Sequence, residues 1–450
     1  MTSKGKERAG SHYQKDQTLR LSIGHWGFEE SAKGLQLGSV NIADLANRMG
    51  TPFYLFDEAR LHRNAHTTLD TARRTIPNAE LFYSLKTNGI PRVLEILKEE
   101  GFGAEAISIF ELKNADAVGF AKKRMILNGP GKGDDALRLA TNWGVLIQVE
   151  SLSEARALAR IAGESPGPLR AGVRINPDIF ESRSLTTLRM GSKGSQFGLN
   201  PKSNEFREVV RTLSKTRGIQ LTSLSAHIGT GIVSAEPFRQ LARELVTLRQ
   251  ALRSEEIEIP IVNLGGGYPV SSEVRYPEGA FDTLETGEPV AVPPPGEISS
   301  FAEICRAIGE EMAADPPAGL YMEPGRLLVS DTFHLITRVN RIKEESGIRF
   351  AILDASRIQN ALFVGRGYHE ILHSAPRGPA EETYTLVGPL CADFDIYARS
   401  RVMPYLSEGD VIIVLDVGAY NLSAQSHWSF PPAPVVSLRD GEAMMLKGRN

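Results

Sequence analysis

Cysteine is scarce in this 450-residue sequence: Cys305 and Cys391 are the only two. Two cysteines cannot form a disulfide framework, which favours a reducing, cytoplasmic setting. No apolar run approaches the roughly 20 residues needed to span a bilayer, and the polar start lacks the apolar core of a signal peptide. A net charge of -3 gives no basic excess. We therefore expect neither nucleic acid nor membrane as a partner.

The sequence also lacks a Gly-x-Gly-x-x-Gly turn after its first strand, which disfavours an open, doubly wound nucleotide-binding sheet. Eight short apolar segments alternate instead with amphipathic helical stretches over about 250 residues, as a closed (β/α)8 TIM barrel requires. The expected strands are Leu81–Leu85, Gly103–Ile107, Met125–Leu127, Leu146–Val149, Leu169–Ile175, Leu221–Ala226, Ile261–Leu264 and Leu320–Met322. The expected helices between them include 91–100, 134–142, 153–161, 204–216, 236–253 and 299–312.

Past Arg326 the helical patterns fade, and short strands separated by Gly, Pro and Asp turns predict a C-terminal, mostly antiparallel β domain. Its first expected strand is 327–340, followed by 350–353, 384–387, 411–415 and 435–438. We expect a flexible leader at 1–35, a segment at 36–56 that packs with the β domain, the barrel at 57–326 and the β domain at 327–450.

Polar residues stand at the carboxyl ends of the expected strands, where barrel enzymes assemble their sites. In strand order they are Lys86, Ser108, Asn128, Glu150, Arg174 with Asn176, His227, Gly265-Gly266-Gly267, and Glu323 with Arg326. Lys86 ends an apolar strand and precedes Thr-Asn-Gly, a turn signal. A lysine in a partly apolar wall, with a lowered pKa, can form a Schiff base with a carbonyl compound or pyridoxal phosphate (PLP); the alternative is a solvated lysine.

Three other motifs each allow a structural and a functional interpretation. The glycine triplet at 265–267 is either a tight turn or a phosphate cradle of successive N–H groups. Glu323 and Arg326 form either a structural ion pair or a site in which the carboxylate holds a pyridine nitrogen protonated and the guanidinium binds a phosphate or carboxylate. His227 is either a core residue or one that stacks beside a cofactor ring.

Taken together, these motifs resemble the fold-type III PLP-dependent decarboxylases: diaminopimelate decarboxylase, with ornithine and arginine decarboxylases as relatives. The shared set, which runs in order from about residue 44 to 430, is Tyr83-Ser84-Leu85-Lys86, His227-Ile228-Gly229, Gly265-Gly266-Gly267, Glu323-Pro324-Gly325-Arg326, Gly388-Pro389-Leu390-Cys391 and Gly418-Ala419-Tyr420. The resemblance implies an alanine-racemase-like barrel, PLP as cofactor, no metal, and a homodimer with shared active sites.

The resemblance also implies the role of each matching residue. Lys86 would carry PLP, His227 would stack on the ring, and Glu323 would hold the pyridinium nitrogen. Cys391, which could otherwise be an inert thiol, would reach in from a second subunit and protonate the carbanion left by CO2. The further cofactor contacts implied are Glu105, Thr230, Gly265, Gly266, Gly267, Gly325, Arg326 and Tyr420, and the substrate contacts are Arg326, Cys391, Asp395 and Tyr420.

Two departures from the family concern the distal end of the substrate. Diaminopimelate decarboxylases carry a glutamate after the cysteine, which reads the distal amino group, whereas this chain has Ala392. The family's Arg-Pro-Ala-Leu-Tyr stretch, which grips the distal carboxylate, is Asn360-Ala361-Leu362-Phe363 here. A methyl group cannot hold an ammonium. We therefore expect a substrate other than meso-diaminopimelate, served by Asp393, Asp395 or Arg366.

The leading hypothesis is thus a carboxy-lyase acting on an amino acid or an amino-acid conjugate. An amino-acid racemase of the same barrel type is the second hypothesis, although that family is expected to pair the pyridine nitrogen with an arginine and not with a residue like Glu323. A non-catalytic homologue that binds a partner subunit or stores PLP is the third. Release of CO2 separates the first hypothesis from the other two.

Overall fold

The computed structural model describes residues 21–164, 167–179, 194–270, 272, 298–362, 369–375 and 381–448. The chain forms two compact units. A barrel unit comprises 60–273 and 297–330, and a β unit comprises 1–59, 274–296 and 331–450. The expected boundary after residue 326 therefore falls four residues later, after 330. None of the described helices is both long enough and apolar enough to cross a bilayer.

The barrel unit is a closed ring of eight parallel strands in the order β10-β11-β12-β5-β6-β7-β8-β9, as expected from the sequence. These strands are β5 (Ala79–Ser84), β6 (Gly103–Ala106), β7 (Met125–Leu127), β8 (Leu146–Val149), β9 (Leu169–Ile175), β10 (Ile219–Ala226), β11 (Ile261–Asn263) and β12 (Gly319–Met322). Side chains from alternating positions fill the interior, where Phe82, Ile126, Leu146, Ile261 and Tyr321 form one buried cluster.

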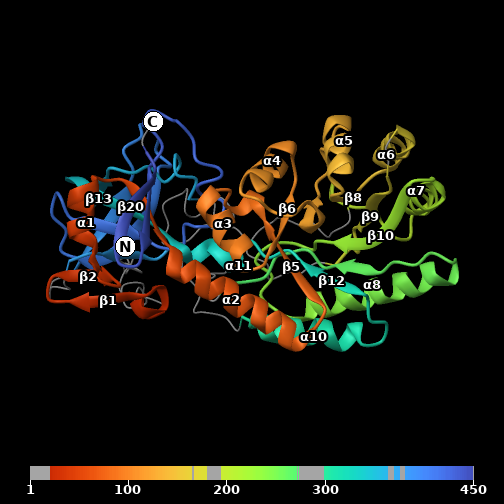
Figure 1. Ribbon diagram of the computed structural model, residues 1–450. Coiled ribbons are helices and arrows are strands. Elements are labelled where there is room, and N and C mark those ends of the chain that lie inside the picture. Colours follow the sequence, from red (N-terminus) through yellow and green to blue (C-terminus); the bar gives the residue numbers. More distant parts are fainter. Residues whose placement is uncertain are drawn as a thin grey trace, which may run out of the picture. The chain divides into compact units, whose positions relative to one another are not determined.

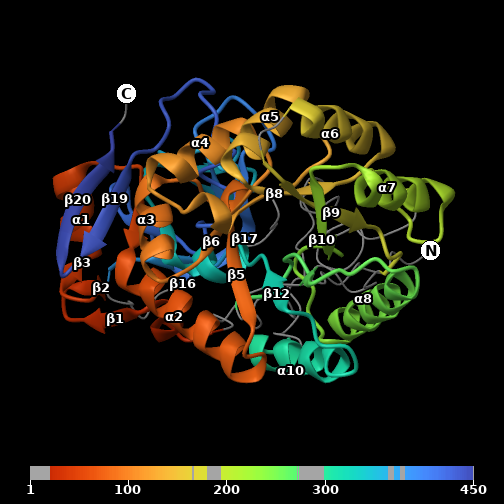
Figure 2. The same ribbon diagram turned by 45° about the vertical axis from the view of Figure 1, so that its right-hand side comes forward.

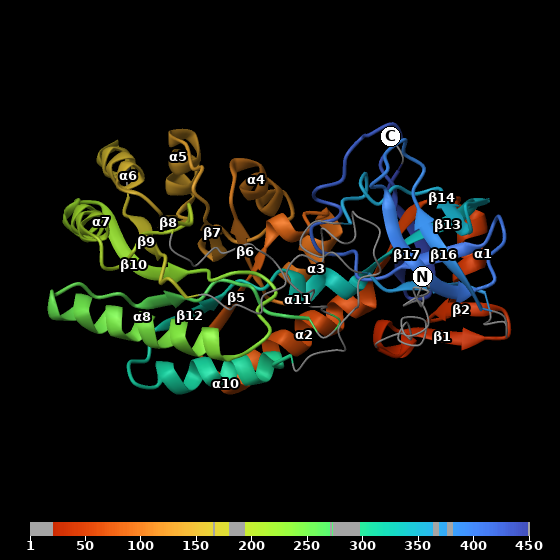
Figure 3. The same ribbon diagram turned by 180° about the vertical axis from the view of Figure 1, so that it is seen from behind.

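Helices surround this ring on its outer side (Figures 1 and 2). They are α2 (Glu58–Thr75), α3 (Pro91–Glu99), α4 (Ile109–Ala117), α5 (Asp134–Trp143), α6 (Leu152–Glu164), α7 (Asn204–Lys215), α8 (Glu236–Ser254), α10 (Phe301–Met312) and α11 (Arg326–Val329). Helices α8 and α10 lie side by side, as seen from behind in Figure 3. The sequence did not predict α4, which buries only Leu112 and Ala115 and so shows little amphipathic pattern.

The β unit contains a small three-stranded sheet and a larger nine-stranded one, most of whose pairs are antiparallel. The small sheet consists of β1 (Phe28–Ser31), β2 (Gly34–Leu37) and β3 (Val40–Asn41), and helix α1 (Ile42–Met49) follows it. The large sheet consists of β4 (Phe53–Asp57), β13 (Phe333–Glu345), β14 (Ile348–Leu353), β15 (Ile371–His373), β16 (Glu381–Val387), β17 (Ile396–Pro404), β18 (Val411–Val414), β19 (Val435–Arg439) and β20 (Glu442–Lys447).

Strand β4 joins the start of the chain to the C-terminal strands, since it pairs with β13 on one side and with β19 on the other. Strands from the start and the end of the chain, drawn in red and blue in Figure 1, therefore belong to one unit, and their side chains share one core. That core includes Trp26, Phe28, Ile42, Ile413 and Val436. The expectation that the segment at 36–56 packs with β-domain strands agrees with this pairing.

Two expectations about the ends of the β unit are wrong. The leader does not extend to residue 35, because a 3-10 helix (Ile23–Trp26) and the β1–β2 hairpin already begin the fold. Trp26 is fully buried and donates its Nε1–H to Asp416 Oδ1 at 2.9 Å. Residues 327–332 are helical and not extended, since α11 and a 3-10 helix (Ser330–Thr332) precede β13. Residues 1–20 lie outside the described part of the chain.

Candidate active site

A cavity of about 170 Å3 lies at the carboxyl ends of the barrel strands. Its walls include Lys86, Glu105, Ile107, Asn128, Gly129, Pro130, Arg174, Phe197, Ser225, Ala226, His227 and Glu323. The sequence placed Lys86, His227, Gly266 and Glu323 at one common mouth. Lys86, His227 and Glu323 do line one cavity, whereas Gly266 is not part of its lining and contacts His227 instead. A cavity of roughly 150 Å3 is known to hold a benzene ring, so this one has room for a single aromatic ring.

Lys86 lies in the 3-10 turn Leu85–Thr87 directly after β5, and its side chain is one-third exposed. Its Nζ lies 3.1 Å from Glu105 Oε2, on the neighbouring strand β6. Glu105 is 1% exposed, and its Oε2 also accepts a hydrogen bond from Ser84 Oγ at 2.5 Å. Lys86 lowers the pKa of this carboxyl group against the opposing effect of burial. The wall around Lys86 is partly apolar, as expected, since Ile107 and Ala226 belong to it. In addition, a buried carboxylate holds the amine.

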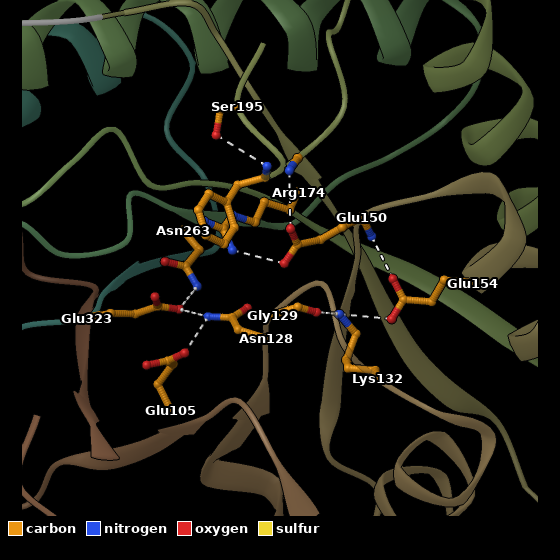
Figure 4. A network of polar contacts seen from close by, with 12 residues as sticks. Glu105, Asn128, Gly129, Lys132, Glu150, Glu154, Arg174, Ser195, Asn263 and Glu323 are labelled. Carbon is orange, nitrogen blue, oxygen red and sulfur yellow. Dashed lines mark hydrogen bonds and ion pairs between the residues drawn. The ribbon is translucent and has the colours of Figure 1, made fainter. Parts of the chain in front are cut away.

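Glu323 follows β12 and is held from two sides by asparagine amides (Figure 4). Asn263 Nδ2 donates to Glu323 Oε1 at 2.7 Å, and Asn128 Nδ2 donates to the same oxygen at 2.9 Å. Among the described residues no group donates to Oε2, so this oxygen is left for a ligand. Burial, with the nearby charge of Glu105, raises the pKa of Glu323 to about 7. The group can therefore share a proton with a bound nitrogen near neutral pH.

His227 follows β10 and accepts a hydrogen bond at Nδ1 from the Gly266 N–H, 3.0 Å away. Since Nδ1 is the acceptor, the neutral ring carries its proton on Nε2. Burial lowers the pKa of His227 well below its usual value, and the positive charges of Arg174 and Lys86 lower it further. The imidazole is therefore neutral, as suits a flat partner for a cofactor ring.

The glycine triplet does not present three successive free N–H groups, so that expectation is corrected. Gly265 N–H donates to Asn263 Oδ1 at 2.8 Å and Gly266 N–H donates to His227, which leaves only Gly267 N–H for an anion among the described groups. Side chains are excluded for steric reasons as well: a Cβ on Gly266 would lie 2.4 Å from the Glu323 carbonyl oxygen. The triplet thus packs the end of β11 against both His227 and Glu323.

Arg174 and Glu150 form a buried ion pair at the far wall of the cavity. Arg174 Nη1 lies 2.9 Å from Glu150 Oε1, and the guanidinium lies over the Phe197 ring at 5.1 Å. Glu150 Oε2 also accepts the Gly198 N–H at 3.1 Å. The pair therefore fixes the Phe197-Gly198 loop as part of the wall, as Figure 4 shows for Arg174 and Glu150.

Seven of the expected cofactor contacts are not among the residues that line this cavity: Thr230, Gly265, Gly266, Gly267, Gly325, Arg326 and Tyr420. Gly325 instead packs against the lysine turn, where an added Cβ would lie 2.3 Å from Thr87 Oγ1. Arg326 is 5% exposed and begins helix α11. Ser108 caps helix α4 by accepting the Glu111 N–H at 3.2 Å. These residues support the rim of the barrel.

The remaining expected residues belong to the β unit. Cys391 is exposed, and Tyr420 has a positive φ of 71°. Asp395 is not available to a substrate, because it is 1% exposed and both carboxylate oxygens accept hydrogen bonds. Its donors are Ser356 Oγ and the backbone N–H groups of Arg357, Ile358 and Leu390. Asp393 is exposed, whereas Phe363 and Arg366 lie outside the described residues.

The sequence did not single out Asn263 or Phe197, and it named Asn128 only as a strand-end residue. Asn263 ends β11 immediately before Leu264 and the glycine triplet, so its position was a usable signal. Phe197 comes from a loop after β9 and carries no such signal, since its place depends on Arg174 and Glu150.

The residues present fit PLP. An aromatic ring has space in the cavity, Glu323 Oε2 is available to its nitrogen, and the Lys86 amine lies in the same wall. Neutral His227 offers a ring face, and Gly267 offers one N–H toward a phosphate. The donor set therefore matches an electron-accepting pyridine cofactor attached to a lysine.

A family model described as the pyridoxal-binding domain of pyridoxal-dependent decarboxylases matches residues 63–330. Diaminopimelate decarboxylase of Methanothermobacter thermautotrophicus is 30% identical over 94% of each chain, and that of Archaeoglobus fulgidus is 29% identical over 92% of this chain and 94% of its own. The crystal structure of diaminopimelate decarboxylase from M. jannaschii shares the fold, with a TM-score of 0.82, 22% identity and coverage of 95% and 96% of the two chains. The protein therefore belongs to the fold-type III PLP-dependent decarboxylases and is a carboxy-lyase.

Proposed function

We propose that this enzyme decarboxylates an amino acid or amino-acid conjugate whose distal end differs from that of meso-diaminopimelate. The observation that carries the proposal is Ala392, a half-buried methyl group next to the exposed Cys391. The proposed equivalent in diaminopimelate decarboxylases is a carboxylate that reads an amino group. An ammonium left without such a partner would cost about 1–3 kcal/mol, or roughly 5- to 150-fold in specificity.

When bound, PLP supplies an electron-accepting ring that stabilises the negative charge left on the α carbon as CO2 departs. In this proposal Lys86 attaches the cofactor, and Glu105 orients the amine through its 3.1 Å contact. Glu323 holds a proton at the ring nitrogen through its available Oε2. His227 supports one face of the ring in its neutral form, and Cys391 Sγ returns a proton to the α carbon.

We also propose a cytoplasmic homodimer in which Cys391 and Tyr420 complete the site of the second subunit. The exposure of the Cys391 thiol in the single chain is compatible with this role. A racemase is less well supported, because the residue available to the ring nitrogen is an acid held by two amides and not an arginine. A non-catalytic role is disfavoured by the intact Lys86–Glu105 pair.

The test follows CO2 release from meso-diaminopimelate, L-lysine, L-ornithine, L-arginine, D-amino acids, glutamate-type acids and their conjugates. We expect release from a substrate other than meso-diaminopimelate. Ala392→Glu should raise kcat/KM for diaminopimelate by roughly 10-fold, since it restores an acid for the distal amine, whereas the neutral control Ala392→Gln should not. Efficient turnover of meso-diaminopimelate by the native enzyme would refute altered recognition, and absence of CO2 from every substrate despite bound PLP would favour the non-catalytic hypothesis.

A further inference from the structure

The side chain of Asn128 touches both carboxylates of the active site. Its Nδ2 donates to Glu105 Oε1 at 3.0 Å and to Glu323 Oε1 at 2.9 Å (Figure 4). Asn128 comes directly after β7 and is 6% exposed. Glu105 belongs to β6 and Glu323 follows β12, so one amide links groups from two separate strands.

The orientation of this amide follows from its neighbours. Both N–H groups of Nδ2 are used, one for each carboxylate, and the reversed amide would place a carbonyl oxygen against two acceptor oxygens. Asn128 Oδ1 is buried and has no hydrogen-bond partner among the described residues. The side chain therefore has a lone acceptor in the cavity wall in addition to its two donors.

Asn263 offers a close comparison, because its amide donates to the same oxygen of Glu323. Its Oδ1, however, accepts the N–H of Gly265, so Asn263 connects Glu323 to the glycine triplet by hydrogen bonds. The Asn128 amide instead donates to Glu105 Oε1, and the other oxygen of that carboxylate, Oε2, contacts Lys86 Nζ. Glu323 thus stands between one asparagine that contacts the glycine turn and one that contacts the lysine-holding acid.

We propose that Asn128 is a positioning residue that couples the acid at the cofactor's ring nitrogen, Glu323, to the acid that holds the cofactor-bearing lysine, Glu105. This inference rests on the proposed roles of Lys86 and Glu323. A shared neutral donor lets two carboxylates occupy one buried site. A change of charge at Lys86 reaches Glu323 through three hydrogen bonds: Lys86 to Glu105, Asn128 to Glu105 and Asn128 to Glu323. The pKa values of the two acids shift in opposite directions. Lys86 and Ser84 donate hydrogen bonds to Glu105 and lower its pKa, whereas burial and the charge of Glu105 raise the pKa of Glu323 although the charge of Lys86 lowers it.

The other charged and titratable groups around this pair are few and can be named. Lys86, Arg174 and His227 line the same cavity, and the charge of Glu111 interacts with that of Glu105. His227 is neutral because burial, Arg174 and Lys86 lower its pKa. Arg174 is already paired with Glu150. The groups that change charge near Asn128 are therefore Lys86, Glu105, Glu323 and, through its interaction with Glu105, Glu111, whose pKa burial raises to about 6.

The test compares two isosteric variants of the PLP-loaded enzyme, Asn128→Asp and Asn263→Asp. Both place a new carboxylate beside Glu323, but only the first places it beside Glu105. The readout is the pH midpoint at which the visible absorbance of lysine-bound PLP titrates. We expect Asn128→Asp to raise this midpoint by about 1 pH unit or more, since a nearby anion favours the protonated form, and Asn263→Asp to raise it by less than a third as much. Equal shifts, or no shift in either variant, would overturn the proposal.

A second measurement, the melting temperature, keeps the proposal testable if Asn128→Asp is destabilised. A protonated aspartic acid donates one hydrogen bond whereas an aspartate donates none, so the deficit in melting temperature against the native enzyme should narrow from about pH 8 to about pH 5. A constant deficit would contradict the bridging role. Both readouts need bound PLP but no CO2 release. An inactive enzyme that shows the expected titration would refute only the proposed function. An active enzyme in which both variants show equal shifts would refute only this inference.

Discussion

Replacing Glu323 by glutamine should abolish a specific pH dependence of stability in the PLP-free enzyme. Glu323 is 7% exposed, and burial and the charge of Glu105 raise its pKa from 4.5 to about 7. Between pH 4.5 and about pH 7, Glu323 is therefore still protonated in the folded chain but already ionised in the unfolded chain. Stability from this group falls as pH rises through that window, and the difference in pKa corresponds to about 3 kcal/mol.

The assay is urea unfolding of the PLP-free native and Glu323→Gln proteins from about pH 4.5 to about pH 8. The variant should gain about 3 kcal/mol relative to the native protein over this range, because glutamine never becomes a buried anion. Glu105→Gln is a control of opposite sign: the pKa of Glu105 is lowered, so its stabilising effect is present above its ordinary pKa of 4.5 and is lost as pH falls. Parallel stability curves for native and Glu323→Gln would refute this account of the site.

Three further predictions follow from single contacts. Lys86→Ala should remove the visible absorbance of bound PLP, and a colour that survives would place the attachment elsewhere. Gly266→Ala should weaken PLP binding by roughly 10-fold or more, measured by fluorescence titration, because its Cβ would lie 2.4 Å from the Glu323 carbonyl oxygen; Gly131→Ala, with no atom within 4 Å of the added Cβ, is the control. Lys132→Met should lower the free energy of unfolding by about 3–5 kcal/mol, since it leaves the buried Glu154 without its ion-pair partner. The double variant Lys132→Met/Glu154→Leu should lose less stability than Lys132→Met, and an equal or larger loss would contradict this explanation.

The barrel was predictable because its periodicity and its chemistry coincide in the sequence. Each apolar strand ends in a polar residue or a glycine turn, and the structure gives Met125–Leu127, Leu146–Val149 and Leu169–Ile175 as strands with the expected bounds. The helix Ile109–Ala117 escaped prediction because it buries few side chains and exposes Phe110. Local patterns therefore define the strands, whereas a helix that buries only two side chains leaves little signal apart from its cap at Ser108.

The errors in the site have a common physical cause: they concern which hydrogen bonds are already occupied. The glycine triplet implied three available N–H groups, but Asn263 and His227 take two of them. Asp395 looked like a substrate contact near Cys391, but backbone N–H groups and Ser356 saturate it. The identity of a residue gives its chemistry, whereas its partners are set by loops that meet only in the folded chain.

In the proposed function the substrate specificity differs while the chemistry of the barrel residues is kept, and the contacts of the residues concerned explain how both can hold. Lys86, Glu105, Asn128 and Glu323 share hydrogen bonds, so losing any one of them leaves a buried polar group without its partner, at a cost of several kcal/mol. Ala392 contributes only its backbone carbonyl, which accepts the Asp395 N–H at 3.1 Å, while the Asp395 side chain fixes the turn. A substitution at residue 392 is therefore expected to leave in place both the turn and Cys391, the proposed proton donor. The proposed change of distal preference at residue 392 therefore needs no change in the hydrogen bonds among Lys86, Glu105, Asn128 and Glu323.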